Sequence, residues 1–262
     1  MAANPFEKMK ISSHKFLEDL KRSKCPKCRS SRMYFCYKCY EYVEDLDAQQ
    51  LPHVELPIMV DIIKHSKELD GKSTAVHARM ISPNQVKIHT YPVIPNYTDE
   101  EKARTLLVFP GPEAKSLQHY ATSSGNKRSL VDDDVINGKR ICLGESPEAQ
   151  ESHEGETIGT RLKPSFTRII VIDSTWNQVH AILNDERLKS IPTVELEGRE
   201  TCYWRSQHNR PKSHLSTIEA IHSFFQQYHE IFGGKYDGQF DNLLFFFKFF
   251  YSMVKKNSKN KS

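Results

Sequence analysis

The stretch "TRIIVIDSTWNQ", residues 167–178, contains the features that decide the fold. Its β-branched run "IIVI" predicts a buried strand, which ends at Asp173. Similar runs occur at "HVELPIMVDII", "VKIHTYPVI", "RTLLVFP" and "TVELEG". Patterns of helical length lie between or after them, notably "WNQVHAILNDERLKS" and "LSTIEAIHSFFQQYHEIF". Strands that alternate with helices predict an α/β protein with a mainly parallel sheet and flanking helices.

The chain divides into parts by composition and periodicity. Residues 1–24 have apolar residues at helical spacing and predict an N-terminal helix, and residues 25–40 form a compact cysteine-rich module. The main domain fills residues 51–240, apart from an insertion at about 118–160 that is rich in Ser, Gly, Asp and Glu and is expected to be unstructured. Residues 241–262 predict a docking helix followed by a flexible, lysine-rich tail.

Charge is distributed unevenly along the 262 residues. The formal net charge is +4, but outside residues 116–160 the chain carries 33 basic and 25 acidic residues. This surplus suits a polyanionic partner, although many proteins this basic bind no nucleic acid. The N-terminus lacks the apolar stretch of a secretion signal, and the run "LLFFFKFFYSMV" is about half as long as a membrane span. We therefore expect an intracellular protein without a membrane partner.

Four cysteines form the pattern CxxC–x7–CxxC. Two residues between paired thiolates allow a tight turn that aims both sulfur atoms at one ion, and two such turns supply the four ligands of a structural Zn²⁺. The expected ligands are Cys25, Cys28, Cys36 and Cys39. A redox CxxC pair is the alternative, but it needs no duplicate. Basic and aromatic neighbours could contact RNA or only cover the metal: Lys27, Arg29, Arg32, Tyr34, Phe35, Tyr37 and Lys38.

The signatures of several common enzyme classes are missing. "DGKST" (70–74) resembles the end of a phosphate-binding P-loop, but Ser66 stands where that motif needs a glycine. The sequence has no GxGxxG after a strand, no HExxH and no GxSxG. Nucleotide hydrolysis, the usual dinucleotide-binding fold and the commonest zinc-protease and hydrolase mechanisms are therefore not indicated.

Asp173 marks a candidate site at the end of its predicted strand. In open α/β sheets, ligands bind beyond the carboxyl ends of the strands, where the loops gather. Ser174 and Thr175 could cap a helix that begins near Trp176, which would explain the hydroxyl groups without any function. Capping does not explain an acid after a buried run together with a tryptophan. The residues alone leave a functional site and a structural turn both open.

Several further segments accompany "DSTW". They are the two CxxC pairs, "HSKELDGKST" (65–74), "LLVFPGPEA" (106–114), "YWR" (203–205) and "LSTIEA" (215–220). The order CxxC…CxxC, HxxExxxKS, FPGxxA, DxTWNQ, YxR and LSTIEA resembles that of the DTW domain family. Each motif is weak alone, but the shared order is specific and covers nearly the whole chain except the insertion and the tail. "KSTAVHARMISP" (72–83) is most similar to animal members.

Members of this family are tRNA-uridine aminocarboxypropyltransferases. The resemblance implies transfer of the 3-amino-3-carboxypropyl group of S-adenosylmethionine to N3 of a tRNA uridine (acp3U formation), with release of methylthioadenosine. It also implies a fold related to the knotted SPOUT methyltransferases, which the residues could not predict because knots are rare. We expect tRNA and not DNA as the partner, a D-loop uridine at position 20 as the target, a monomer, and a location in the nucleus.

The resemblance implies which residues form the site. Asp173 would take the N3 proton, with Thr175 and Trp176 beside it. Cofactor contacts are expected from three loops, at Leu107, Phe109, Pro110, Gly111, Ile172, Ser174, Leu215, Ser216 and Thr217. RNA contacts are expected from Lys72, Arg205 and Lys212. Structural alternatives stay open: a turn-forming acid, a core tryptophan, a solvated lysine, and simple capping of the helix near Ser216, with Glu219 as part of the cap.

Two other functions remain alternatives. A SPOUT-like RNA methyltransferase would release S-adenosylhomocysteine, and a non-catalytic zinc-containing RNA-binding protein would depend on its basic surface alone. The DxTW and LSTIEA elements favour the aminocarboxypropyltransferase, because they mean little for a module that only binds RNA.

Overall fold

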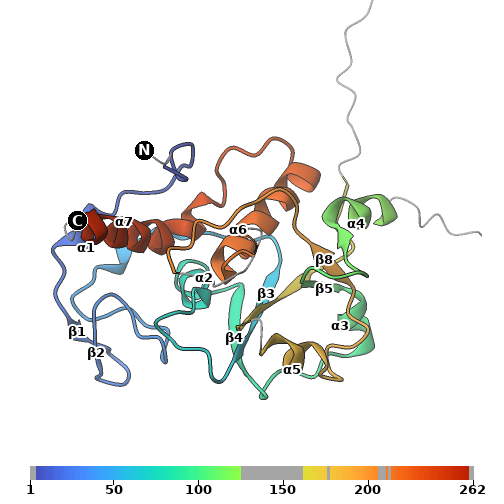
Figure 1. Ribbon diagram of the computed structural model, residues 1–262, viewed down its shortest axis with the longest axis horizontal. Helices are drawn as coiled ribbons and strands as arrows, with labels where there is room; N and C mark the ends of the chain where they lie inside the picture. Colours follow the sequence, from blue (N-terminus) through green and yellow to red (C-terminus); the bar gives the residue numbers. More distant parts are fainter. Residues whose placement is uncertain (1–3, 125–161, 176–177, 206–210, 212–213, 260–262) are drawn as a thin grey trace, which may run out of the picture.

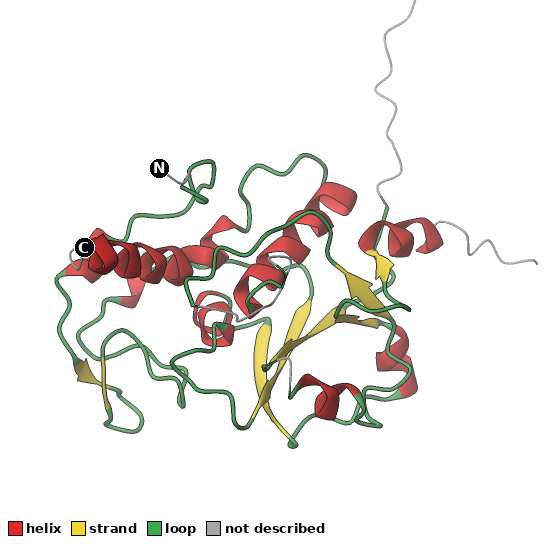
Figure 2. Cartoon of the chain, viewed as in Figure 1, coloured by secondary structure: helices red, strands yellow, loops and turns green. Residues whose placement is uncertain are grey.

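The computed structural model describes residues 4–124, 162–175, 178–205, 211 and 214–259. Its centre is a sheet of six parallel strands in the order β4-β3-β7-β5-β8-β6 (Figures 1 and 2). The strands are β3 (Met59–His65), β4 (Val86–Tyr91), β5 (Thr105–Val108), β6 (Lys115–Ser116), β7 (Arg168–Asp173) and β8 (Thr193–Glu195). The predicted α/β class is confirmed, and all five strand-like runs contain a strand. Within this sheet, the two-residue strand β6 was not predicted, because it is too short for a periodic pattern.

The middle strand, β7, lies between β3 and β5. Ile172 pairs with Ile63 of β3, and Val171 pairs with Val108 of β5. Because all six strands are parallel, their carboxyl ends meet at one edge of the sheet. The loops after β3, β5 and β7 therefore gather where Asp173 ends its strand.

The side chains of β7 alternate between two hydrophobic layers. Ile169 and Val171 are buried with residues of α2 (Ala75–Ile81), α6 (Thr217–Tyr228) and α7 (Phe245–Lys259) on one face. Ile170 and Ile172 pack with Ile182 of α5 (Val179–Leu183) on the other face. This period of two is the geometry of a strand covered on both sides, and it places the side chain of Asp173 on the α2–α6 face.

The remaining helices are short. They are α1 (Lys15–Glu18), α3 (Asp99–Ala103), α4 (Leu117–Ser124), the 3₁₀ helices η1 (Ala48–Gln50) and η3 (Asp241–Leu244), and the π-helix η2 (His229–Gly233). The start of α3 has a full capping box between Thr98 and Glu101. The cysteine module contains only a two-stranded antiparallel sheet, β1 (Ser23–Lys24) and β2 (Ser31–Arg32).

The expected helix over residues 1–24 is wrong, because among the described residues 4–24 only Lys15–Glu18 is α-helical. The apolar residues of this segment pack against α7 instead. The ring of Phe6 lies 6.2 Å from that of Phe247, and Leu17 is fully buried. Long-range burial, and not an amphipathic helix, explains their spacing.

The docking helix near the C-terminus is confirmed. Phe245, Phe246 and Phe247 open α7 and are completely buried. The flexible tail expected after Met253 is wrong up to Lys259, because α7 continues to that residue. No helix in the described part of the chain is long and apolar enough to span a membrane.

The expected insertion at about 118–160 overlaps a helix. Its first residues belong to α4, so the boundary predicted at residue 118 is wrong by several positions. Leu117 and Ala121 of this helix are buried, which gives the segment an apolar face that its polar composition concealed. The rest of the expected insertion, residues 125–161, lies outside the described residues.

Candidate active site and metal centre

Asp173 lies between the starts of two helices at the carboxyl edge of the sheet. Its side chain is buried, Oδ2 accepts a hydrogen bond from Ser73 Oγ at 2.6 Å, and Oδ1 accepts one from Thr217 Oγ1 at 2.5 Å. Burial raises the pKa of Asp173, and the two hydroxyl donors oppose that rise. The carboxylate therefore ties the loop before α2 to the first residue of α6.

The adjacent Thr74 strengthens this link. Its Oγ1 accepts a hydrogen bond from the backbone N–H of Ile218 at 3.1 Å. An N–H group in the first turn of α6, which has no partner within the helix, is thus bonded to a side chain of another segment. Ser73 and Thr74 were not among the predicted site residues. The available signal was the pair of hydroxyls that ends the "HSKELDGKST" segment.

The "YWR" segment holds the loop at residues 65–74 from the other side. Tyr203 donates its hydroxyl to the carbonyl of Lys72 at 2.7 Å, and Arg205 Nη2 donates to the carbonyl of Gly71 at 2.5 Å. Lys64 pairs with Asp70 across the same loop at 2.5 Å. Arg205, predicted to contact RNA, thus also positions the loop. Lys72 is exposed, whereas Lys212 lies outside the described residues.

Glu68 is a second carboxylate at this edge that sequence reasoning did not select. Its side chain is half-buried and makes no hydrogen bond to any described residue. Burial raises the pKa of Glu68, and the charge of Asp173 adds to the rise, while Lys64, Lys72 and Arg205 oppose it. A partly buried acid without a partner, among cations, is typical of a group that acts on a ligand.

Ser174 and Thr175 do not cap α5, which was the structural alternative for these residues. Helix α5 begins at Val179, and its N-cap residue Gln178 makes no side-chain capping bond. Ser174 Oγ instead donates to the carbonyl of Thr175 at 3.2 Å, and Thr175 itself is exposed. Trp176 lies outside the described residues.

Capping is observed at α6. Glu219 accepts a hydrogen bond from the backbone N–H of Ser216 at 2.9 Å, as in a capping box. The same carboxylate accepts from Thr201 Oγ1 at 2.7 Å and from the Cys202 N–H at 2.8 Å. Glu219 therefore also fixes the segment that leads to Tyr203 and Arg205.

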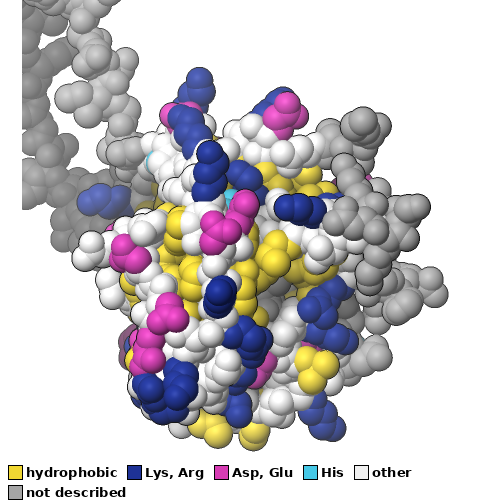
Figure 3. Space-filling view, turned by 90° about the vertical axis from the view of Figure 1, so that its left-hand side faces the viewer, with side chains coloured by type: hydrophobic (Ala, Val, Ile, Leu, Met, Phe, Trp, Pro, Cys, Tyr) yellow, Lys and Arg dark blue, Asp and Glu magenta, His cyan; other side chains and the backbone are white. Residues whose placement is uncertain are grey.

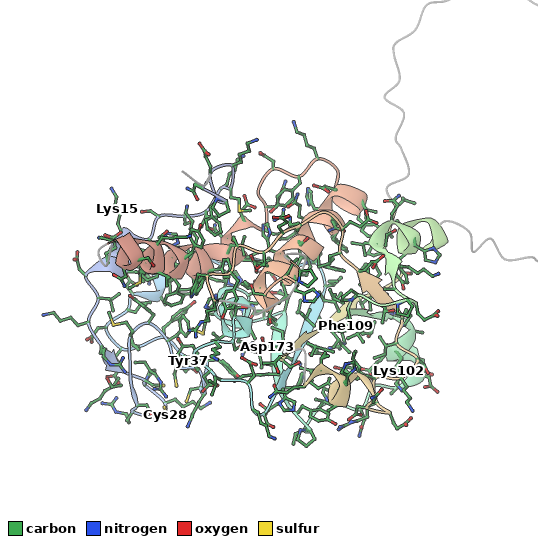
Figure 4. The ribbon with its side chains drawn as sticks, in the orientation of Figure 1. Lys15, Cys28, Tyr37, Lys102, Phe109 and Asp173 are labelled. Atoms are coloured by element: carbon green, nitrogen blue, oxygen red, sulfur yellow. The ribbon has the colours of Figure 1, made fainter. Side chains whose placement is uncertain are left out.

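The residues expected to contact a cofactor divide between two faces of the sheet. Phe109, Pro110 and Gly111 follow β5 at the same edge as Asp173 (Figure 4). Leu215, Ser216 and Thr217 open α6 on the Asp173 face, and Ser174 follows β7. Leu107 and Ile172 pack in the cluster beside α5, on the opposite face. Strand alternation causes the division, because neighbouring residues of β7 point to opposite sides.

The four cysteines of the N-terminal module come together as predicted. Their sulfur atoms all lie within 4.8 Å of one another, and Cys28 Sγ and Cys36 Sγ are 3.7 Å apart. Tetrahedral zinc with bonds of about 2.3 Å places neighbouring sulfur atoms about 3.8 Å apart, so the cluster fits Zn²⁺. A disulfide would need about 2.05 Å. Four protein ligands close the coordination shell, which suits a structural metal.

Both halves of the cluster use the same turn. Arg29 N–H donates to the carbonyl of Cys25, and Tyr40 N–H donates to the carbonyl of Cys36, each at 2.9 Å. Arg29 and Tyr40 both have positive φ, at 61° and 56°. The duplicated CxxC spacing thus produces two equivalent turns, as expected for two pairs of metal ligands.

Comparison with known proteins gives a family. The sequence model of the DTW domain matches residues 33–255. Three vertebrate relatives share the description tRNA-uridine aminocarboxypropyltransferase 1. The human protein is 42% identical over 98% of this chain and 85% of its own length, that of Xenopus tropicalis 41% over 98% and 88%, and that of Mus musculus 41% over 96% and 84%. No solved structure matches. The ordered motifs, the Asp173 site and the domain match agree: the chain belongs to the DTW domain family.

Proposed function

We propose that this chain transfers the 3-amino-3-carboxypropyl group of S-adenosylmethionine to N3 of a uridine in tRNA. The proposal rests chiefly on the 41–43% identity to vertebrate tRNA-uridine aminocarboxypropyltransferase 1 over nearly the whole chain. In this reaction uridine N3 attacks the γ-carbon of the amino acid tail. The bond between that carbon and sulfur breaks with its electron pair on sulfur, a base takes the N3 proton, and methylthioadenosine leaves.

Presentation of the sulfonium decides which group moves, because all three of its carbon substituents are electrophilic. The γ-carbon must lie within about 3–3.5 Å of N3, in line with the sulfur. We assign this positioning to the loop after β5, the turn after Asp173 and the start of α6. The hydrogen bonds from Ser73 and Thr217 to Asp173 support the assignment, because they hold two of these segments in one arrangement.

The proton acceptor has two candidates. Asp173 is the residue expected from the sequence, but both of its oxygens already accept hydroxyl groups and its side chain is only 4% exposed. Glu68 is more exposed, has no hydrogen-bond partner among the described residues and has a raised pKa. We propose that Glu68 takes the N3 proton and that Asp173 positions the two helix starts around it.

Glu68→Gln is expected to lower kcat by about 10²- to 10⁴-fold, the usual contribution of a general base. A carboxylate base works only when ionised, so wild-type kcat/KM should fall as the pH decreases through the raised pKa of Glu68. The variant should lose that acidic limb. A pH profile of kcat/KM for both proteins measures this. An unchanged rate and profile in Glu68→Gln would return the role to Asp173.

We also propose a target uridine, a location in the cell and a chain path. N3 lies on the Watson–Crick edge, so the target must be unpaired or flipped out, which favours a loop uridine such as position 20 of the D-loop. The lysines near the C-terminus suit either tRNA binding or entry into the nucleus. A knotted, SPOUT-like chain path draws support from the parallel sheet, where β7 lies between β3 and β5 although the chain reaches it after both.

Incubation of the purified protein with S-adenosylmethionine and tRNA is expected to yield methylthioadenosine and acp3U in equal amounts. Mass spectrometry of the small molecules and of digested nucleosides measures both. Release of S-adenosylhomocysteine would instead identify a methyltransferase. If neither product appears although tRNA binds, the chain would be a non-catalytic RNA-binding protein.

A further inference from the structure

The cysteine module is the most basic segment of the chain. Residues 21–40 contain seven Lys or Arg residues and no Asp or Glu. Glu44 pairs with Arg29, and four thiolates around Zn²⁺ would carry a net charge of −2, so a positive surplus remains. Figure 3 looks onto this side of the molecule and shows Lys and Arg side chains, with several Asp and Glu side chains among them, around a hydrophobic area. Such a surface suits a polyanion.

A cavity of about 220 Å³ lies between this module and α7. Arg22, Arg32, Tyr37 and Phe250 are part of its lining. Two guanidinium groups beside aromatic rings are the combination that binds an unpaired nucleotide, because phosphate and base are recognised together. The volume lies below the roughly 300–1,000 Å³ of pockets for drug-sized ligands, and it suits a single base.

Two polar groups of this pocket have no partner within the described part of the chain. Arg32 Nε is buried without a hydrogen bond, and the hydroxyl of Tyr37 makes none. Arg22 uses Nη2 to donate to the carbonyl of Ser31 at 2.9 Å, which fixes its guanidinium at the rim. A buried donor without a partner is costly, so Arg32 Nε indicates a site that a ligand completes.

The structure separates the aromatic neighbours of the metal into two groups. Tyr34 and Phe35 are buried, with rings 5.2 Å from Phe249 and 4.9 Å from Phe246, so they attach the module to α7. Tyr37 is half-buried and faces the pocket. Tyr34 and Phe35 also line the pocket, but of these three rings Tyr37 is the most exposed and is the one available to an RNA base.

The pocket lies on the side of the module next to the candidate active site. Phe35, which also lines the pocket, has its ring 6.1 Å from that of His77 on α2, the helix that directly follows the loop 65–74. In Figure 4, Tyr37 lies between Cys28 and Asp173. An RNA strand at the loop 65–74 can therefore reach the module.

We propose that the pocket formed by Arg22, Arg32 and Tyr37 binds an unpaired nucleotide of the substrate tRNA outside the reaction site. The base lies against Tyr37, and its phosphate lies at the two guanidinium groups. This proposal rests on tRNA being the substrate. The cysteine module would then take part in tRNA recognition. The separation of the pocket from the reaction site would set the distance between the bound nucleotide and the modified uridine.

Tyr37→Ala is expected to weaken tRNA binding by roughly 5- to 150-fold, since stacking contributes about 1–3 kcal/mol per base. The KM for tRNA should rise by a similar factor, while kcat and the KM for S-adenosylmethionine stay unchanged. Tyr37→Phe should retain most of the affinity because it keeps the ring. Arg22→Ala, at an exposed side chain, should reduce the slope of log Kd against log salt by about 1. Lys102→Ala, on α3 at the far side of Figure 4, is the matched control. It should change neither the affinity for tRNA nor the salt slope.

Direct titration of the full-length, metal-loaded protein with tRNA measures binding without catalysis, and metal content confirms that each variant keeps its module intact. Wild-type affinity and salt slope in both Tyr37→Ala and Arg22→Ala would overturn the proposal. An equal loss of heparin binding in Tyr37→Ala would also contradict it, because that result indicates a general anion site. If the wild type transfers no group but the variants still lose tRNA affinity, the proposed reaction is wrong and the proposed nucleotide pocket is supported.

Discussion

Removal of the metal from Cys25, Cys28, Cys36 and Cys39 is expected to unfold the N-terminal module and to abolish tRNA modification. A structural zinc site contributes about 10–16 kcal/mol of apparent binding free energy at neutral pH, which is more than most domains have in total stability. The buried rings of Tyr34 and Phe35 would then leave α7 and expose its aromatic face. Chelator titration with colorimetric zinc release, followed by circular dichroism and activity, measures these changes.

Cys36→Ser tests the same site without a chelator. It should lower the zinc content and the melting temperature, because a hydroxyl is a poor zinc ligand. Cys202→Ser is the matched control, since the Cys202 thiol donates to Glu219 Oε1 at 3.3 Å and a hydroxyl can do the same. If the wild-type protein stripped of zinc melts at the same temperature as the zinc-loaded protein, the assignment of a structural zinc site is wrong. A mass lower by two hydrogens per cysteine pair would indicate disulfides instead.

Asp173→Ala is expected to reduce kcat/KM by at least about 100-fold and to destabilise the protein. The change leaves the hydroxyls of Ser73 and Thr217 without their acceptor, at about 1–3 kcal/mol for each unsatisfied buried group. The starts of α2 and α6 then keep only the Thr74–Ile218 hydrogen bond of the links described above. A displacement of about 1 Å at a reacting site costs on the order of 10² in rate. Denaturant unfolding and steady-state kinetics measure the two effects separately.

Asp173→Asn separates charge from shape. The pKa of Asp173 is higher in the folded protein than in the unfolded chain, so wild-type stability should fall as the pH rises through that higher pKa. The Asn variant should lack this dependence and keep more activity than Asp173→Ala. A loss of kcat in a folded Asp173→Asn as large as that in Asp173→Ala, with no acidic limb in the residual activity, would make Asp173 the base.

Asp61→Asn is the control for a buried carboxylate without a role at the site. Asp61 is buried on β3, nearer the end of the strand that is opposite the Asp173 edge of the sheet. Its Oδ2 accepts hydrogen bonds from Tyr97 and Arg168. The variant should lose stability, because a buried ion pair is broken. Its kcat/KM per folded molecule should stay at the wild-type level. A loss as large as in Asp173→Ala would show that any weakening of the sheet abolishes activity.

Much of the fold was predictable because its signals are local. The run "IIVI" packs against hydrophobic residues on both faces of the sheet, and its β-branched composition predicts a strand without knowledge of the neighbouring strands. Two CxxC pairs separated by seven residues form one cluster because each pair builds its own turn. The LSTIEA segment carries Ser216 and Glu219 at the spacing of a capping box, and the capping contact is present.

Predictions failed where a local pattern had a distant cause. The apolar residues of the segment 1–24 are spaced like those of a helix, but they are placed by contact with α7. Ser174 and Thr175 precede a helical pattern, yet α5 begins only at Val179. Glu68 was not selected, because nothing in its neighbours along the chain shows that it is half-buried and close to Asp173.

The sequence by itself determined the longer strands of the sheet, the clustering of four cysteines and the presence of an acid at the end of β7. Only the tertiary structure decided what that acid does, because its partners Ser73 and Thr217 lie 100 and 44 residues away. Periodicity and capping act over a few residues and can be read along the chain. Contacts across the sheet edge depend on the order in which parallel strands assemble, and that order arises from the packing of the whole domain.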